Sequence, residues 1–297
     1  MLPELAIDLD IKKVLFPVMG FPKLDGVRLL NFDNQATGRS LKPHANIYTT
    51  QRFSDPIYKG FDGEATLGSA TSSSLCRDTS SALSTITGEP DIVWNVFDYL
   101  TEDTVKLPYL SRIGALHSYI EKYNPKDVMI IEYTPIHTPV QLMDFYHSCL
   151  ELGFEGAIYR DPLGFHKDGR STVNEGSYLR LKPFSDKDAV VLEIIEAQQN
   201  LNEKKKNALG LTERSSHKEN KIGKGMVGTL ICRDILTNKI VNIGPGKMTH
   251  EERIYYFNSP DKLINEIIKY RSVDTGIKDA PRFGRYICRR SREDTSE

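Results

Sequence analysis

The hexapeptide Lys23-Leu24-Asp25-Gly26-Val27-Arg28 combines a turn with the beginning of a strand. Asp-Gly is a typical turn dipeptide, and the stretch from Val27 to Phe32 favours an extended conformation. Lys23 is therefore predicted to lie at a bend that leads into a strand. A solvated surface turn would need no function, but a fixed Lys-x-Asp-Gly-x-Arg pattern arises by chance in only roughly a few chains per thousand of this length.

The chain after this turn mixes strand and helix patterns. Alternating residues predict strands at 92–97 and 177–182, and the apolar run 128–131 predicts another. A short strand is also predicted at 157–160, directly after the second of two helices. Helices are predicted at 108–123 and from Thr138, an N-cap followed by proline, to a stop at Gly153. In the strand at 177–182, Leu179 and Leu181 should face one side and Arg180 and Lys182 the other.

The pattern changes after Pro183-Phe184. Strands are predicted at 189–195, 226–232 and 239–243, and helices are predicted to begin at the capping box Thr249–Glu252 and at Ser259-Pro260. The second of these helices would carry Leu263, Ile264, Ile267 and Ile268. We therefore predict an α+β domain at residues 1–184 and a small, mostly β domain at 185–297.

Composition excludes several classes of protein. The 297 residues are 39% hydrophobic and 27% charged, which is ordinary for a globular chain and unlike disordered or collagen-like sequences. The longest apolar run, 14–21, is far shorter than the roughly 20 residues of a membrane span, and we expect no membrane association and an intracellular, cytoplasmic location. The four cysteines form no CxxC pair.

Charge is distributed unevenly along the chain. Residues 1–184 hold 18 basic and 23 acidic side chains, whereas residues 185–297 hold 21 and 17. The net charge of the whole chain is only -1, so a generally basic nucleic-acid binder is not indicated. Any long-range attraction for a polyanion is predicted to come from the C-terminal part.

A series of motifs follows the hexapeptide in order. They are Thr37-Gly38-Arg39-Ser40, Asp62-Gly63-Glu64, Trp94 to Tyr99, Glu155-Gly156-Ala157-Ile158-Tyr159-Arg160, Leu179-Arg180-Leu181-Lys182-Pro183 and, near the end, Pro281-Arg282-Phe283-Gly284-Arg285 followed by Arg289. In type and order this series resembles that of the covalent nucleotidyltransferases, and most closely the small two-domain ATP-dependent DNA ligases of phages and viruses. The resemblance spans residues 23–289, nearly the whole chain.

The resemblance implies both a fold and a reaction. The fold would be an N-terminal nucleotidyltransferase (adenylation) domain, with antiparallel sheets and flanking helices, followed by a C-terminal OB-fold β-barrel. The reaction would be the sealing of nicked double-stranded DNA through a lysyl-AMP intermediate, by a monomer that uses ATP and Mg²⁺, with Mn²⁺ as a substitute. The alternatives are an RNA ligase, a GTP-dependent mRNA capping guanylyltransferase, or a non-catalytic OB-fold protein that binds nucleic acid. Phe21 leaves the choice of nucleobase open, because ligases often have a polar residue two positions before the nucleophile.

The resemblance also implies roles for individual residues. Lys23 would be the nucleophile and, with Arg28, Arg180 and Lys182, would form the catalytic set. Lys23, Arg28, Arg39, Glu64, Phe97, Arg180, Lys182 and Arg285 would contact the nucleotide, with Phe97 stacked on the base. Glu155 and Glu64 would hold the metal, Glu64 alternatively contacting the ribose. On periodicity alone, Phe97 would instead be a core residue.

Chemistry sets a requirement for Lys23 in this mechanism. An amine is nucleophilic only when neutral, and an ordinary lysine pKa of about 10.4 leaves it protonated. We therefore expect burial, cationic neighbours or a metal to lower the pKa of Lys23, and Arg180 and Lys182 are candidates for the cationic neighbours.

The segment 203–224 has seven basic and three acidic residues and lies between predicted barrel strands. A flexible cationic insertion could wrap duplex DNA and gain affinity through counterion release. The alternative is a solvated loop without a role.

Overall fold

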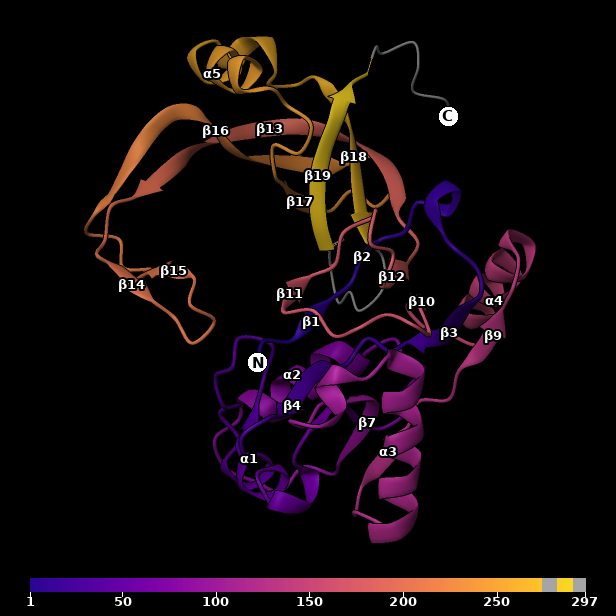
Figure 1. Cartoon of the computed structure of the whole chain (residues 1–297). Coiled ribbons are helices and arrows are strands. Elements are labelled where there is room, and N and C mark those ends of the chain that lie inside the picture. The colour runs from indigo at the N-terminus through magenta and orange to yellow at the C-terminus, as the bar shows by residue number, and fades with distance from the viewer. Residues whose placement is uncertain (274–281, 291–297) are drawn as a thin grey trace. The chain divides into compact units, whose positions relative to one another are not determined.

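The computed structural model describes residues 1–273 and 282–290 and divides into two compact units, Met1–Lys182 and Pro183–Glu297 (Figure 1). The fold class is α+β, as predicted. Within the described residues, no helix is long and apolar enough to cross a membrane. The motif residue Pro281 lies outside the described residues.

Two five-stranded sheets form the frame of the first unit. One has the order β2 (Ile7–Asp8), β12 (Tyr178–Leu181), β10 (Gly156–Arg160), β3 (Val18–Lys23) and β9 (Thr134–Ile136). The other has the order β5 (Ala36–Thr37), β4 (Val27–Asn31), β6 (Phe61–Leu67), β7 (Ile92–Tyr99) and β8 (Val128–Ile130). A short parallel pair, β1 (Glu4–Leu5) with β11 (Gly169–Arg170), completes the strands of this unit.

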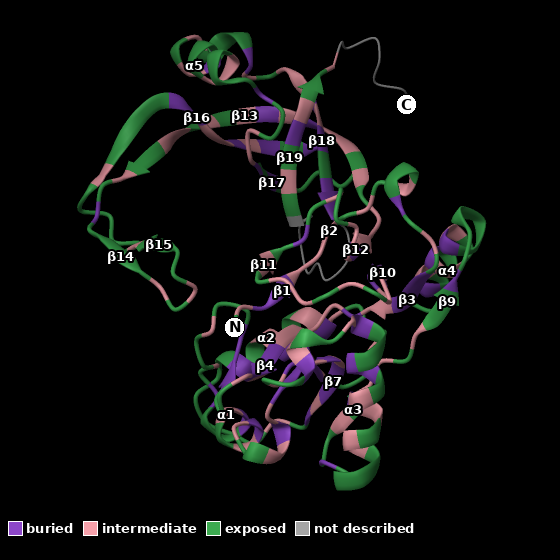
Figure 2. Ribbon diagram, in the orientation of Figure 1, coloured by how far each residue is buried: buried purple, intermediate pink, exposed green. Residues whose placement is uncertain are grey.

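Four helices accompany these sheets: α1 (Ile47–Phe53), α2 (Leu75–Ser84), α3 (Tyr109–Tyr123) and α4 (Pro139–Glu151). As predicted, Thr138 caps α4 by accepting a hydrogen bond from the backbone N–H of Gln141. Helix α3 packs on the core of the second sheet around Trp94 and Phe61, and α4 packs on the first sheet around Tyr159. Figure 2 shows buried residues concentrated on β3, β4 and β7.

A curved five-stranded sheet dominates the second unit. Its order is β17 (Ile240–Ile243), β16 (Lys221–Asp234), β13 (Ser185–Asn200), β18 (Ile267–Val273) and β19 (Arg282–Arg289). Gly244, just after β17, exchanges backbone hydrogen bonds with β19, at 2.8 Å to Gly284 and 3.0 Å to Tyr286. The two outer strands of the sheet therefore meet at this point, around a core covered by α5 (His250–Asn258).

The prediction of a helix from Ser259-Pro260 is wrong. Only one 3-10 turn forms, at Pro260–Lys262, and Ile267–Val273 is strand β18, in which Ile267 pairs with Val190 of β13. Asn265 has a φ of 65°, in the left-handed region, which stops any helix at this point. The spacing of the isoleucines suits both a helix and a strand, and pairing with β13 makes the segment a strand.

The lysine-rich insertion is more ordered than the sequence indicated. Strands β13 and β16 extend past the sheet as a long ribbon, and the insertion between them forms a hairpin of β14 (Lys204–Lys206) and β15 (Thr212–Arg214). All three lysines of β14 are exposed. Asn202 anchors the base of the hairpin by donating to the carbonyls of Ser215 and His217 at 2.9 and 2.8 Å.

Candidate active site

Lys23 lies at the end of β3, where the chain crosses from the first sheet of its unit to the second. The crossing is the turn Leu24–Gly26, as the hexapeptide predicted. A Cβ on Gly26 would lie 2.8 Å from Cγ of Glu64 and closer still to the carbonyl oxygen of Ala65, so only glycine allows β4 and β6 to approach here. The turn thus holds Lys23 beside the acidic motif of β6.

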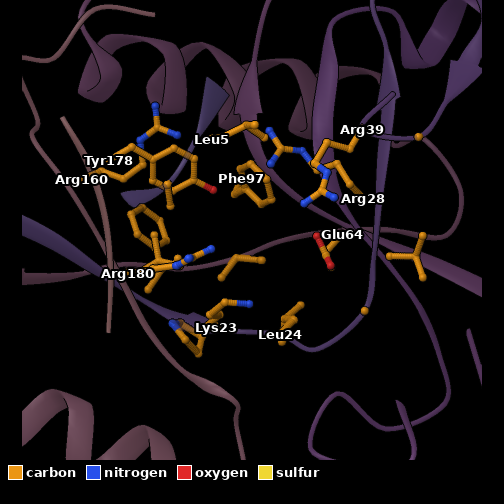
Figure 3. Close-up of a pocket in the computed structure, with 18 of the residues that line it drawn as sticks. Leu5, Lys23, Leu24, Arg28, Arg39, Glu64, Phe97, Arg160, Tyr178 and Arg180 are labelled. Carbon is orange, nitrogen blue, oxygen red and sulfur yellow. The ribbon is translucent and has the colours of Figure 1, made fainter. Parts of the chain in front are cut away.

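A cavity of about 560 Å³ opens beside this turn. It is lined by six of the predicted site residues: Lys23, Arg28, Arg39, Glu64, Phe97 and Arg180. Figure 3 shows the side chains of Lys23, Arg180 and Glu64 directed towards the same open space. Residues that are separated by up to 157 positions in the sequence therefore line one cavity.

Glu155 joins the nucleophile candidate to the basic strand. Its carboxylate accepts hydrogen bonds from the amine of Lys23 and, at 3.3 Å, from the amine of Lys182. The side chain of Glu155 is only 7% exposed, so both ion pairs are shielded from water. Lys23, Glu155 and Lys182 form one continuous charged cluster at the edge of the cavity.

The pKa of Lys23 is raised, whereas we expected from the sequence that it would be lowered. Burial disfavours the ammonium, but the carboxylates of Glu155, Glu64 and Asp25 outweigh it and raise the pKa of Lys23 above its ordinary value. Without a nucleotide the amine is therefore protonated. Burial would raise the pKa of Glu155, but the positive charges of Lys23 and Lys182, which both contact its carboxylate, lower it.

Glu64 is the second acid of the cavity. Burial raises the pKa of its carboxyl to about 7, although Lys23 and Arg28 oppose the shift. Its side chain makes no hydrogen bond to any other residue that the structure describes. An acid with free oxygens that faces a cavity can accept a ligand hydroxyl or a cation.

Mg²⁺ can be held by one or two protein carboxylates when substrate phosphates and water supply its other ligands. Glu64 and Glu155 offer the hard oxygens that such an ion prefers, and each influences the charge of Lys23. Among the described residues, no cluster of three or more acidic, histidine or cysteine side chains could hold a metal alone. The two glutamates therefore fit a metal that arrives with phosphates, and do not form a self-sufficient site.

Arg28 lies deep in the cavity wall. It forms two hydrogen bonds with Asp62, both of 2.5 Å, and a third of 3.3 Å with the carbonyl of Glu4. Its guanidinium lies 4.7 Å from the centroid of the Phe97 ring. Phe97 is half-buried and lines the cavity, so the core position favoured by periodicity alone is wrong.

Strand β12 has the predicted alternation. Leu179 and Leu181 pack into the core beside α4, while Arg180 lines the cavity and Lys182 reaches Glu155. Arg180 also forms an ion pair of 2.6 Å with Asp8 of β2. The separation of Leu179 and Leu181 from Arg180 is as predicted, and Lys182 follows directly after the strand.

Two further predicted site residues, Arg39 and Arg285, have exposed side chains. Arg39 is exposed on the loop after β5 at the rim of the cavity. Arg285 lies on β19 of the second unit, where its side chain is exposed and its backbone pairs with Arg271. These positions leave both guanidinium groups accessible to a ligand.

Sequence reasoning gave no role to several residues that line the cavity, chiefly Leu5, Tyr109, Arg160, Arg170 and Tyr178. Arg160 and Ile158 share one face of β10 with period two, so this signal was present in the quoted motif. Leu5 belongs to β1, which contains none of the motifs, and nothing in the sequence indicated its position.

The chain is similar to several proteins of known structure. No protein-family model and no curated protein matches the chain. Among solved structures, Chlorella virus DNA ligase-adenylate is 26% identical, with a TM-score of 0.54, over 98% of this chain and 99% of the viral one. The chain resembles a DNA ligase along its whole length.

Two other solved structures share the fold. A Lig E DNA ligase has a TM-score of 0.69 at 17% identity, over 98% of this chain and all of the other. The ATP-dependent DNA ligase of bacteriophage T7 has a TM-score of 0.51 at 14% identity, over 97% of this chain and 98% of the other. The resemblance to ATP-dependent DNA ligases that the motifs predicted is confirmed.

Proposed function

We propose that this protein is an ATP-dependent DNA ligase that seals nicks in duplex DNA through a covalent lysyl-AMP intermediate. The single observation that carries the proposal is the placement of Lys23 in a cavity beside Glu64, Arg180 and the Glu155–Lys182 pair. The full-length similarity to Chlorella virus DNA ligase-adenylate supports it.

The first step forms a P–N bond. The Lys23 amine loses a proton and attacks the α-phosphorus of ATP, the bond to the bridging oxygen breaks, and pyrophosphate leaves with that electron pair. Glu155 already accepts a hydrogen bond from this amine and is placed to accept the proton. Arg180 and Lys182 supply positive charge where the phosphates carry negative charge.

The later steps transfer AMP and then release it. An oxygen of the 5′-phosphate at the nick attacks the phosphorus of lysyl-AMP, the P–N bond breaks, and Lys23 regains a proton. The 3′-hydroxyl then attacks the 5′-phosphorus, loses its proton, and displaces AMP. We assign Arg39, at the exposed rim, to the phosphate of the DNA as well as to that of the nucleotide.

The remaining nucleotide contacts follow from the cavity wall. The adenine base packs against Phe97, and Glu64 accepts a hydrogen bond from the ribose or holds the metal with Glu155. Mg²⁺, or Mn²⁺ in its place, would neutralise phosphate charge when bound. Arg28 is held in place by Asp62, so its guanidinium is oriented before the nucleotide arrives.

We assign residues 1–184 to adenylation and residues 185–297 to an OB-fold domain that contacts DNA and supplies Arg285 to the nucleotide. The hairpin of β14 and β15 would act as a clamp on duplex DNA. Its exposed lysines, Lys204 to Lys206, are suited to phosphate contacts, and the contacts at Asn202 hold its base. We propose that the protein acts on nicked DNA as a monomer.

The test uses Mg²⁺ and α-labelled ATP or GTP, followed by nicked DNA or nicked RNA. We expect one AMP per chain, bound to Lys23 by intact-mass and peptide analysis, and sealing of nicked DNA. Lys23→Ala should abolish the adduct, whereas Lys167→Ala, at an exposed lysine paired with Glu175, should retain it.

Each alternative function predicts a different result. Label from GTP alone would indicate a capping guanylyltransferase, and sealing of RNA alone would indicate an RNA ligase. Absence of any label would leave only a non-catalytic nucleic-acid-binding protein.

A further inference from the structure

A buried cluster of charges lies behind the candidate nucleotide cavity. Three arginines each form an ion pair with a different carboxylate. Arg28 pairs with Asp62, Arg112 with Asp98 at 2.7 Å, and Arg160 with Glu4 at 2.7 Å. Burial of a charge is costly unless the charge is paired and hydrogen-bonded. The cluster is balanced only because all three carboxylates are present.

The third carboxylate comes from a part of the chain that contains none of the chemical motifs. Glu4 belongs to β1 and is 1% exposed. Its carboxylate accepts hydrogen bonds from Arg160 and, at 3.1 Å, from Ser177, and its carbonyl accepts one from Arg28. Glu4 therefore contacts two arginines that line the cavity.

Arg160 depends strongly on this contact. Its guanidinium lies between the rings of Tyr109 and Tyr178, 4.0 and 4.1 Å from their centroids, and only 3% of its side chain is exposed. Its Nε has no hydrogen-bond partner among the described residues, and Asp98, at 3.4 Å, is already paired with Arg112. Glu4 is thus the main anion that fixes the position of Arg160.

Strand β1 also forms part of the cavity wall. Leu5 and Ala6, the two residues after Glu4, line the cavity, and Figure 3 shows Leu5, Arg28 and Arg160 around it. The strand is held by a two-residue parallel pairing with β11 and by a hydrogen bond of 2.7 Å from Arg170 to the carbonyl of Ala6. Leu2 just before the strand contacts Asp168 and His166, and β2 just after it pairs with β12. The buried Glu4 side chain adds one more anchor to these contacts, at Arg160 and Ser177.

We propose that Glu4 is a positioning residue of the nucleotide site and that docking of β1 is coupled to nucleotide binding. Glu4 does not touch the reacting atoms and acts through Arg160 and Arg28. Coupling is reciprocal, so a nucleotide that contacts the ordered arginines must also favour the docked strand. The inference rests on the proposed function, because ATP is the ligand.

The first test measures the rate of AMP-adduct formation against ATP concentration in single-turnover experiments. Glu4→Gln should raise the half-saturating ATP concentration about tenfold, equivalent to about 1.4 kcal/mol, and change the maximal rate less than about threefold. Glu175→Gln is the control, because Glu175 is an exposed carboxylate that pairs with Lys167. This control should match the wild type.

A purely structural role would give another pattern. An irreversibly misfolded fraction would reduce the amount of adduct in proportion and leave the half-saturating ATP concentration unchanged, and that result would overturn the proposal. Thermal unfolding of the same samples checks that Glu4→Gln is fully folded at the assay temperature, because reversible partial unfolding would itself raise the half-saturating concentration. A wild-type protein that forms no adduct would instead reject the proposed function and, with it, ATP as the ligand. The two failures are therefore distinguishable.

The second test keeps the proposal falsifiable if Glu4→Gln does not fold. Hydrogen exchange is measured on residues 2–8 of the Lys23→Ala protein with and without ATP and Mg²⁺, so that no covalent adduct forms. Coupling predicts at least about fivefold slower exchange with ATP, the lower end of typical coupling between sites. Unchanged exchange at ATP concentrations that protect the segment around Arg28 would refute the coupling.

Discussion

The substitution Gly156→Ala tests whether the geometry around Lys23 is required for adenylation. Gly156 lies on β10 opposite Lys23 of β3, directly after Glu155. A Cβ at this position would lie 3.0 Å from Cα of Lys182 and closer still to the carbonyl oxygen of Leu181. Both are backbone atoms, so no flexible side chain can move aside.

The size of the effect follows from these contacts. Ordinary contacts of a Cβ begin near 3.4 Å, so β10 and β12 must separate to admit the methyl group. Separation by about 1 Å would move Glu155 away from Lys182 and change the position of Lys23, and a misplacement of this size can cost about 100-fold in rate. Overpacking would also lower the free energy of unfolding by about 1–3 kcal/mol.

The assay is single-turnover formation of the AMP adduct at saturating ATP, with thermal unfolding measured on the same samples. Gly114→Ala is the matched control, because Gly114 lies within α3 and an added Cβ would meet no heavy atom within 4 Å beyond its chain neighbours and the adjacent helix backbone. It should retain the wild-type rate and add up to about 1 kcal/mol of stability. A folded Gly156→Ala protein that forms the adduct within about threefold of the wild-type rate would refute the reasoning.

Two other predictions concern the buried charges and the hairpin. Asp98→Asn should lower the free energy of unfolding in urea by about 3–5 kcal/mol, because Arg112 loses its buried partner. Burial favours the neutral acid, but Arg112 and Arg160 outweigh it and lower the pKa of Asp98. The difference in free energy of unfolding between the wild type and Asp98→Asn should therefore be fully present above the unfolded-state pKa of about 3.9 and should decrease as the pH falls further. The same free-energy difference at pH 7 and at pH 3 would contradict this. Replacing the three lysines 204–206 by glutamine should reduce the slope of log affinity for nicked DNA against log salt by up to about 2.7, with self-adenylation unchanged. An unchanged slope would exclude these lysines from the clamp.

Local sequence patterns predicted those parts of the site that depend on local geometry. The Asp-Gly turn placed Lys23 at a bend, and the alternation in β12 separated Leu179 and Leu181 from Arg180. Both follow from the conformational preferences of a few consecutive residues and from the period of two in a strand. The same reasoning failed at Ile267 and Ile268, because their spacing suits a helix and a strand, and pairing with β13 distinguishes the two.

Periodicity also gave the wrong environment for Phe97. A strand with alternating aromatics predicts one buried face, and Trp94 and Val96 are indeed fully buried beside Phe61. Phe97 points to the opposite face of β7, where Arg28 lies over its ring and the cavity opens. Whether the second face of a strand meets solvent, a core or a cavity depends on other segments, so the strand's own sequence cannot specify it.

Glu4 marks the limit of prediction from the sequence more sharply. Its partner Arg160 is 156 residues away. The contact depends on the pairing of β1 with β11 and on the position of Arg160 of β10 between Tyr109 of α3 and Tyr178 of β12. A motif identifies residues whose chemistry the reaction requires at a fixed spacing. A carboxylate that balances a buried arginine can come from any segment that passes within reach, because only its charge and position matter. Such positioning residues therefore leave little local signal, and the structure is needed to find them.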